Sequence, residues 1–141
     1  MERFERGQAR VALMSIKPCF AAEIFEGRKR YEFRRVRVSL GPGDTVVVYE
    51  SAPVSLVTGH FTVDSVCTGP PSEIAMLEGR KRARGYVISY LNGAVTASAI
   101  RLVDARKWAE AVTLSVATGL ARPPQAYQFL AGETDGLLRP Y

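Results

Sequence analysis

Five positive charges lie within ten residues near the beginning of the sequence, in the stretch EGRKRYEFRR at 26–35. Arginine and lysine side chains contact phosphates, and the arginine guanidinium also stacks on bases. The same stretch holds Lys29 and Glu32, and a lysine acts as a base where burial or neighbouring cations lower its pKa. These residue types allow three interpretations: a surface for a polyanion, an acid–base site, or a solvated charged segment.

The alternation within this stretch predicts a β-strand rather than the face of a helix. Tyr31 and Phe33 alternate with Arg30, Glu32 and Arg34, so the aromatic side chains share one face and the charged ones share the other. The period slips directly afterwards, which indicates a bulge or the end of the strand. We expect the aromatic face to lie in the core.

A second basic position precedes this strand. The apolar run at 10–16 predicts a buried strand, and Pro18 begins a predicted short helix over 18–26. Lys17 lies at the junction, beside the backbone N–H groups of the helix start, which favour anions. Lys17 is therefore interpreted either as a phosphate contact or as an ordinary surface lysine.

The rest of the chain alternates predicted strands with short helices. Strands are predicted over 45–51, 55–66 and 94–108, and helical or turn segments over 68–79, 80–93, 109–120 and 122–132. Within the second of these strands, Gly59 indicates a bulge or a close backbone approach. The pattern predicts an α+β fold, with a small curled sheet or pseudo-β-barrel and short flanking helices. We expect a flexible segment at 1–9 and a single domain over 10–141.

Composition favours a globular, basic protein. The chain has 141 residues, 47% hydrophobic residues, a net charge of +5 and a pI near 9.5, which favours anionic partners. Cys19, Cys67 and the single histidine, His60, do not form the ligand spacing of a structural zinc site, so we expect neither a metal nor a cofactor. The charged first ten residues lack a signal-peptide pattern, and no apolar stretch predicts a membrane helix. These features predict a cytoplasmic protein.

Several blocks resemble ASCH domains, a branch of the PUA-like superfamily. The first is ALMSIKPCFAAEIFEGRKRYEFRR at 12–35, with Lys-Pro, then Gly-x-Lys, then a strand that carries Glu and Arg. The segments at 43–66 and 122–130 are similar to the second and closing blocks of the family. The resemblance implies a PUA-like pseudo-barrel that binds RNA or nucleotides, with some relatives acting as hydrolases.

One departure from the family concerns catalysis. In ASCH amidohydrolases that act on acylated cytidine, the lysine of the Gly-x-Lys step activates a threonine three residues later. Lys29 matches this lysine, but Glu32 stands at the threonine position, so the nucleophile of that scheme is absent. A further glutamate that assists in those enzymes could be Glu73 or Glu78.

The sequence leaves two main functions open. The first is binding of RNA, another single-stranded nucleic acid, a nucleotide or a nucleoside in a basic cleft, with a regulatory role. We expect this cleft to be lined by Lys17, Arg28, Lys29, Glu32, Arg34 and Arg35. The second is hydrolysis in the same cleft by Lys29 and Glu32, as a modified-nucleoside amidohydrolase or a weak ribonuclease. A second basic cluster, RKRAR at 80–84, and stacking candidates such as Tyr86 and Tyr90 fit the first function.

Overall fold

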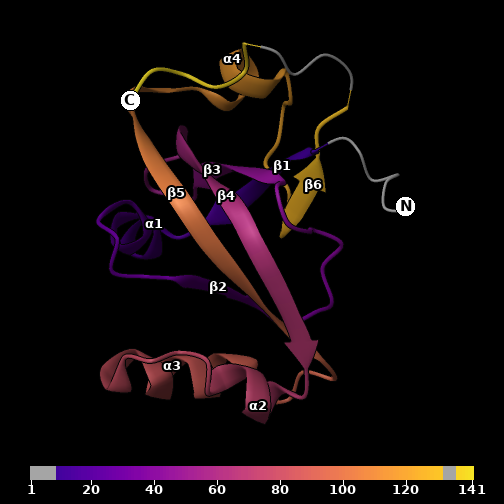
Figure 1. Ribbon diagram of the computed structural model, residues 1–141. Coiled ribbons are helices and arrows are strands. Elements are labelled where there is room, and N and C mark those ends of the chain that lie inside the picture. Colours follow the sequence, from indigo (N-terminus) through magenta and orange to yellow (C-terminus); the bar gives the residue numbers. More distant parts are fainter. Residues whose placement is uncertain (1–8, 132–135) are drawn as a thin grey trace. The chain divides into compact units, whose positions relative to one another are not determined.

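The structure, a computed structural model, describes residues 9–131 and 136–141 (Figure 1). Its contacts divide the chain into two compact units, which we describe separately. The first unit contains the chain up to Lys29, 43–62 and the chain from Asp104 onwards; the second contains 30–42 and 63–103. The segment predicted to be flexible lies, apart from Ala9, outside the described residues. The expectation of a single domain stays a prediction.

The described residues form a six-stranded mixed sheet and four short helices. The strand order is β2-β5-β4-β3-β1-β6. The elements are β1 (Val11–Ile16), α1 (Pro18–Phe25), β2 (Tyr31–Arg34), β3 (Thr45–Glu50), β4 (Leu56–Gly69), α2 (Pro71–Ala75), α3 (Lys81–Leu91), β5 (Ala97–Val112), α4 (Leu114–Thr118) and β6 (Tyr127–Phe129). The predicted α+β class is confirmed. No helix in the described parts of the chain has the length and apolar character needed to cross a bilayer.

In the first unit, the core lies on strands β1 and β3. These strands are parallel and pair from Val11 with Thr45 to Ile16 with Glu50, and β6 pairs antiparallel with β1. β3 reads TVVVYE, and β-branched residues of this kind suit a strand that is covered on both faces. The buried cluster of this unit includes Leu13, Val47, Tyr49, Val57, Trp108, Leu114 and Ala117.

In the second unit, α2 and α3 cover one face of the antiparallel pair β2 and β5. β2 and β5 pair from Tyr31 with Arg101 to Arg34 with Ser98. Val87 and Leu91 are four residues apart in α3, so they lie on one face of the helix, and both are buried. They pack in a cluster with Phe33, Ile74, Ala75, Ala97 and Ala99.

Two predictions about the second half of the chain are wrong. β5 continues to Val112, so the helix expected over 109–120 is reduced to α4. The segment at 122–132 contains strand β6 instead of a helix, because its backbone pairs with β1. Both errors have one cause: pairing with distant strands outweighs local propensity.

Candidate nucleic-acid interface

Lys17 occupies the junction between β1 and α1. Its backbone is extended, with φ −63° and ψ 143°, and Pro18 takes the first helical position. The Lys17 carbonyl accepts from the N–H groups of Phe20 and Ala21, so the backbone of this residue holds the helix start. Its side chain is exposed. Lys17 is therefore positioned on the surface, as a contact to a solution anion requires.

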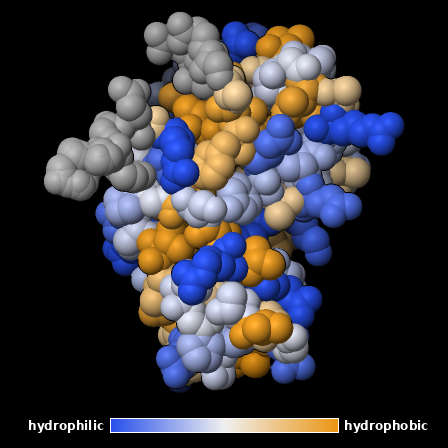
Figure 2. Space-filling model, turned by 90° about the vertical axis from the view of Figure 1, so that its right-hand side faces the viewer, coloured by the Kyte–Doolittle hydropathy of each residue, from blue (hydrophilic) through white to orange (hydrophobic). Residues whose placement is uncertain are grey.

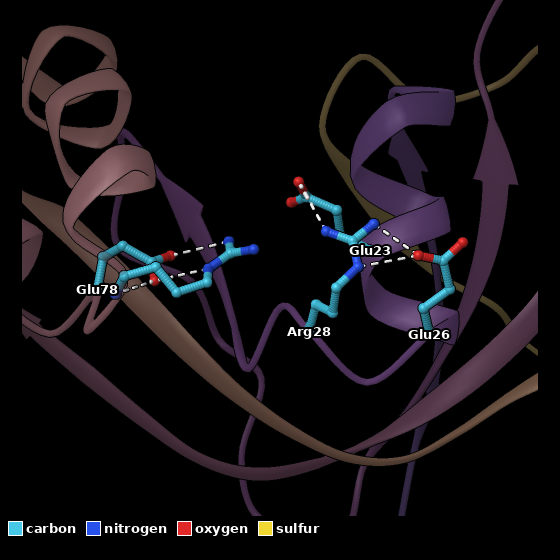
Figure 3. A network of polar contacts seen from close by, with 5 residues as sticks. Glu23, Glu26, Arg28 and Glu78 are labelled. Carbon is cyan, nitrogen blue, oxygen red and sulfur yellow. Dashed lines mark hydrogen bonds and ion pairs between the residues drawn. The ribbon is translucent and has the colours of Figure 1, made fainter.

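The end of α1 fixes Arg28. Gly27 has φ 80°, a left-handed conformation that ends the helix and suits glycine. The Arg28 side chain then turns back to α1, where its Nε donates to Glu26 Oε1 at 2.9 Å and its Nη1 lies 3.6 Å from Glu23 Oε2 (Figure 3). A phosphate at Arg28 would share this guanidinium with two carboxylates. Among the predicted site residues, Arg28 thus carries a charge that is already largely balanced.

Lys29 is buried, although it belongs to a strongly charged run. Its exposed fraction is 6%, and its Nζ lies 5.3 Å from the ring centroid of Phe20. An ammonium group at this distance from an aromatic ring gains a cation–π interaction. The interpretation of the whole run as a solvated face is therefore wrong at this position.

β2 places Glu32 and Arg34 on one side of the strand, as predicted from the alternation. Both side chains are buried, with exposed fractions of 7% and 8%, and Arg34 Nη2 lies 3.0 Å from Glu32 Oε2. Phe33 packs in the core on the other side, with an exposed fraction of 4%. Both faces of β2 are thus covered, and its charged side carries a buried ion pair rather than a row of solvated arginines.

The end of α3 lies beside this ion pair, within the second unit. Arg35 Nη2 donates to the carbonyl of Asn92, just beyond the helix, at 3.1 Å. Partial burial raises the pKa of Tyr90, and the Glu32 carboxylate raises it further, whereas Arg34 opposes this effect. The charges of Glu32 and Arg34 on β2 therefore act on the ionisation of the Tyr90 hydroxyl. The fold brings together Glu32, Arg34, Arg35 and Tyr90 at this point.

The prediction did not connect Tyr90 with β2. The sequence feature that pointed to Tyr90 was its four-residue spacing from Tyr86, which places both rings on one face of α3. The sequence does not show that this face ends beside β2, because the two elements are separated by more than forty residues of chain.

The basic cluster at 80–84 is partly structural. Arg80 Nε lies 3.1 Å from Glu78 Oε2, and Arg84 Nε donates to the Glu78 carbonyl at 2.8 Å. Glu78 is buried, with an exposed fraction of 4%, and Figure 3 shows its carboxylate within this network. Two of the four basic residues are therefore held at Glu78, in the connection between α2 and α3, while Lys81 and Arg82 are exposed.

The chemistry available for metal binding is limited in the described residues. They contain no group of three or more His, Cys, Asp or Glu side chains that could hold an ion. Cys19 and Cys67 are exposed free thiols. His60 accepts a hydrogen bond at Nδ1 from Trp108 Nε1 at 2.8 Å, so it has a structural contact.

The comparison with protein families decides the classification. The model of the ASCH domain matches residues 14–116, which is most of the chain. The protein belongs to the ASCH domain family. The match begins in β1 and ends in α4, so it includes every residue of the predicted site and leaves β6 outside. A comparison with curated protein sequences found no match.

Solved structures agree with this ASCH assignment. An ASCH protein from Zymomonas mobilis is 23% identical, with a TM-score of 0.76 over 91% of this chain and 92% of that chain. A hypothetical protein from Leishmania major is 13% identical, with a TM-score of 0.54 over 89% of each chain. A protein from Agrobacterium tumefaciens is 17% identical, with a TM-score of 0.53 over 87% of this chain and 86% of that chain. At these identities the likeness concerns the fold, and it confirms the PUA-like fold class.

Proposed function

We propose that this ASCH domain binds RNA or a related single-stranded nucleic acid or nucleotide. One observation carries the proposal: Lys29, Glu32 and Arg34, three charged residues within six positions, are all buried. Moving a charge out of water costs several kcal/mol even after relaxation of the protein. Charged groups held in such surroundings are concentrated at functional sites. A family linked with RNA and nucleotide binding gives these buried charged residues their most direct interpretation.

The ion pair on β2 suits recognition of a base. The Glu32 carboxylate can accept from exocyclic amino groups, and the Arg34 guanidinium can donate to ring nitrogens and carbonyl oxygens. Their 3.0 Å contact holds each group in a defined orientation. Orientation of donors and acceptors before binding lowers the entropic cost of recognition.

The exposed lysines and arginines support the attraction of a phosphate backbone. Lys17 and Arg35 are exposed, and the chain carries a net charge of +5. Figure 2 shows one face of the molecule, on which apolar patches are interrupted by hydrophilic residues, as is usual for a protein surface. We therefore favour an anionic ligand over an apolar protein partner.

The test is a salt titration of RNA binding. We expect a fluorescein-labelled single-stranded RNA of mixed sequence to bind at low salt, with a log–log slope that becomes about 0.7 less steep for each phosphate contact removed. Lys17→Gln should weaken binding and reduce the slope, and Lys29→Gln should weaken binding. Lys107→Gln is the matched control, because Lys107 is exposed on β5 and outside the proposed site.

Two results would overturn the proposal. One is no RNA binding at low salt by a folded protein. The other is an equal loss in Lys107→Gln and in the two site variants, which would leave only general charge attraction. Cleavage of the RNA by the wild type, lost in Lys29→Gln without loss of binding, would replace the binding function with the hydrolase alternative.

A further inference from the structure

Helix α3 exposes two tyrosines that stack on each other. Tyr86 and Tyr90 have exposed fractions of 47% and 37%, and their ring centroids lie 6.1 Å apart with an angle of 6° between the planes. The core contacts of the helix come instead from Val87 and Leu91. Two exposed aromatic rings with parallel planes offer ring faces of the kind on which nucleic-acid bases stack.

Positive charge lies at both ends of this pair. Arg82 is exposed and lies one turn before Tyr86, on the same face of α3. At the other end, Arg35 is held at the Asn92 carbonyl, just after the helix. From Arg82 to Tyr90 the helix rises by about 12 Å, which is about three or four nucleotides of a stacked strand.

The charges of the helix favour a nucleic acid over a protein as the occupant. The sequence of α3, KRARGYVISYL, contains three basic residues and no acidic residue. Glu32, the carboxylate whose charge acts on Tyr90, is in the ion pair with Arg34. The phosphates of a nucleic acid are complementary to the positive charges at both ends of the tyrosine pair. The bases of the same strand are complementary to the two rings between those charges.

We propose that Arg82, Tyr86, Tyr90 and Arg35 form a base-stacking subsite for a single-stranded nucleic acid. In this subsite the two arginines contact phosphates, and the tyrosine rings stack on successive bases. The inference rests on the proposed RNA-binding function and gives the stacking candidates Tyr86 and Tyr90 a defined subsite between Arg82 and Arg35. Because stacking does not select one base, the subsite contributes affinity for single strands rather than sequence specificity.

The experiment compares tyrosine variants with a matched control on the same helix. Tyr86→Ser combined with Tyr90→Ser should weaken binding of labelled single-stranded RNA about tenfold or more, because each lost stack removes part of the affinity. Tyr86→Phe combined with Tyr90→Phe keeps the rings and should bind like the wild type. Ile88→Ser is the control: Ile88 is 50% exposed but lies two residues from Tyr86, on a different side of α3.

A second probe separates stacking from charge. An abasic oligonucleotide of the same length keeps its phosphates and lacks bases, so the serine variants should bind it as the wild type does. The slope of affinity against salt should also be unchanged in these variants, since no phosphate contact is removed. Arg82→Gln, in contrast, should weaken binding of both oligonucleotides.

The outcomes distinguish this inference from the proposed function. If the serine variants bind RNA like the wild type while Lys29→Gln is impaired, the α3 subsite is wrong and RNA binding elsewhere stands. If the folded wild-type protein binds no oligonucleotide, both fail. If the serine variants change only the oligomeric state, α3 is an interface between copies of the chain, and the subsite is also wrong.

Discussion

The buried ion pair of Glu32 and Arg34 has an energetic consequence at the residue scale. The attraction between the two groups, 3.0 Å apart, offsets their loss of hydration only as long as both are present. Removal of one leaves the other as a buried charge, which typically costs about 3–5 kcal/mol. Exposed residues such as Lys17 and Tyr86 are therefore better probes of binding, because their replacement leaves the fold intact.

His60, which is partly buried, and Trp108, which is buried, form a second polar pair, in the first unit. Because Trp108 Nε1 donates to His60 Nδ1 at 2.8 Å, the neutral imidazole carries its proton on Nε2. Tyr141 contacts the same imidazole edge-on, with ring centroids 6.3 Å apart. Protonation of His60 at Nδ1 would remove the acceptor for Trp108.

A pH dependence of stability follows from this contact. Burial, with a smaller contribution from Arg106, lowers the pKa of His60 below its ordinary value of 6.5. The unfolded chain therefore binds more protons than the folded one as pH falls below 6.5, and the free energy of unfolding decreases until the folded-state pKa is passed. We expect urea unfolding, followed by the fluorescence of Trp108 between about pH 5 and pH 8, to show this decrease.

The control for this experiment is His60→Asn, which retains an acceptor for Trp108 and does not titrate. Because His60 is the only histidine of the chain, the variant should lose the decrease in stability between about pH 6.5 and pH 5. The same pH dependence in wild type and variant would contradict the assignment.

At the element scale, strand β4 contains a bulge that depends on Gly59. Val48 pairs with Gly59 and Tyr49 pairs with Val57, so Thr58 is the extra residue. A Cβ at Gly59 would collide with the backbone carbonyl of Arg106 and come within 2.7 Å of the Phe25 ring. The predicted close approach at Gly59 is thus confirmed: α1 and β5 both pack against the bare backbone of β4.

Two glycine substitutions should have opposite effects on stability. We expect Gly59→Ala to lower the free energy of unfolding by about 3 kcal/mol or more, because a clash with backbone cannot be relieved by a rotamer change. Gly85→Ala should raise it by about 0.5–1 kcal/mol, because Gly85 lies in α3 with no atom within 4 Å of the added methyl group. Urea denaturation measures both, and equal stability of the two variants would contradict the packing at β4.

At the scale of the whole molecule, the chain has nineteen lysines and arginines and fourteen acidic residues. Part of this charge is balanced locally, since Arg28, Arg34 and Arg80 each contact a carboxylate. The remaining excess acts over distance and is screened by salt. We expect this excess charge to set the association rate constant of an anionic ligand. The stacking and hydrogen-bonding groups are expected to set the dissociation rate constant.

The kinetics of RNA binding should separate these contributions. We expect the association rate constant, measured by stopped-flow fluorescence, to fall about tenfold or more between about 50 mM and 200 mM salt. The tyrosine-to-serine variants of α3 should show the same decrease, together with faster dissociation. An association rate that does not respond to salt would contradict a role for the net charge.

The sequence by itself determined which side chains share a face and where most elements lie. Period-two alternation placed Glu32 and Arg34 together on a strand, and β1, α1, β3 and β4 lie where the local patterns predict them. These features depend on residues that are close in the chain. The motif spacing around Lys17 and Lys29 was also sufficient to predict the ASCH family.

Only the tertiary structure decided whether those faces are covered. Alternation does not reveal that the charged side of β2 is buried, because burial depends on what packs against the strand and not on the order of its residues. The pairing of β6 with β1 and the extension of β5 to Val112 are likewise long-range. Whether a charged residue is a solvated surface group or part of a site depends on desolvation, which is a property of the packed molecule rather than of a segment.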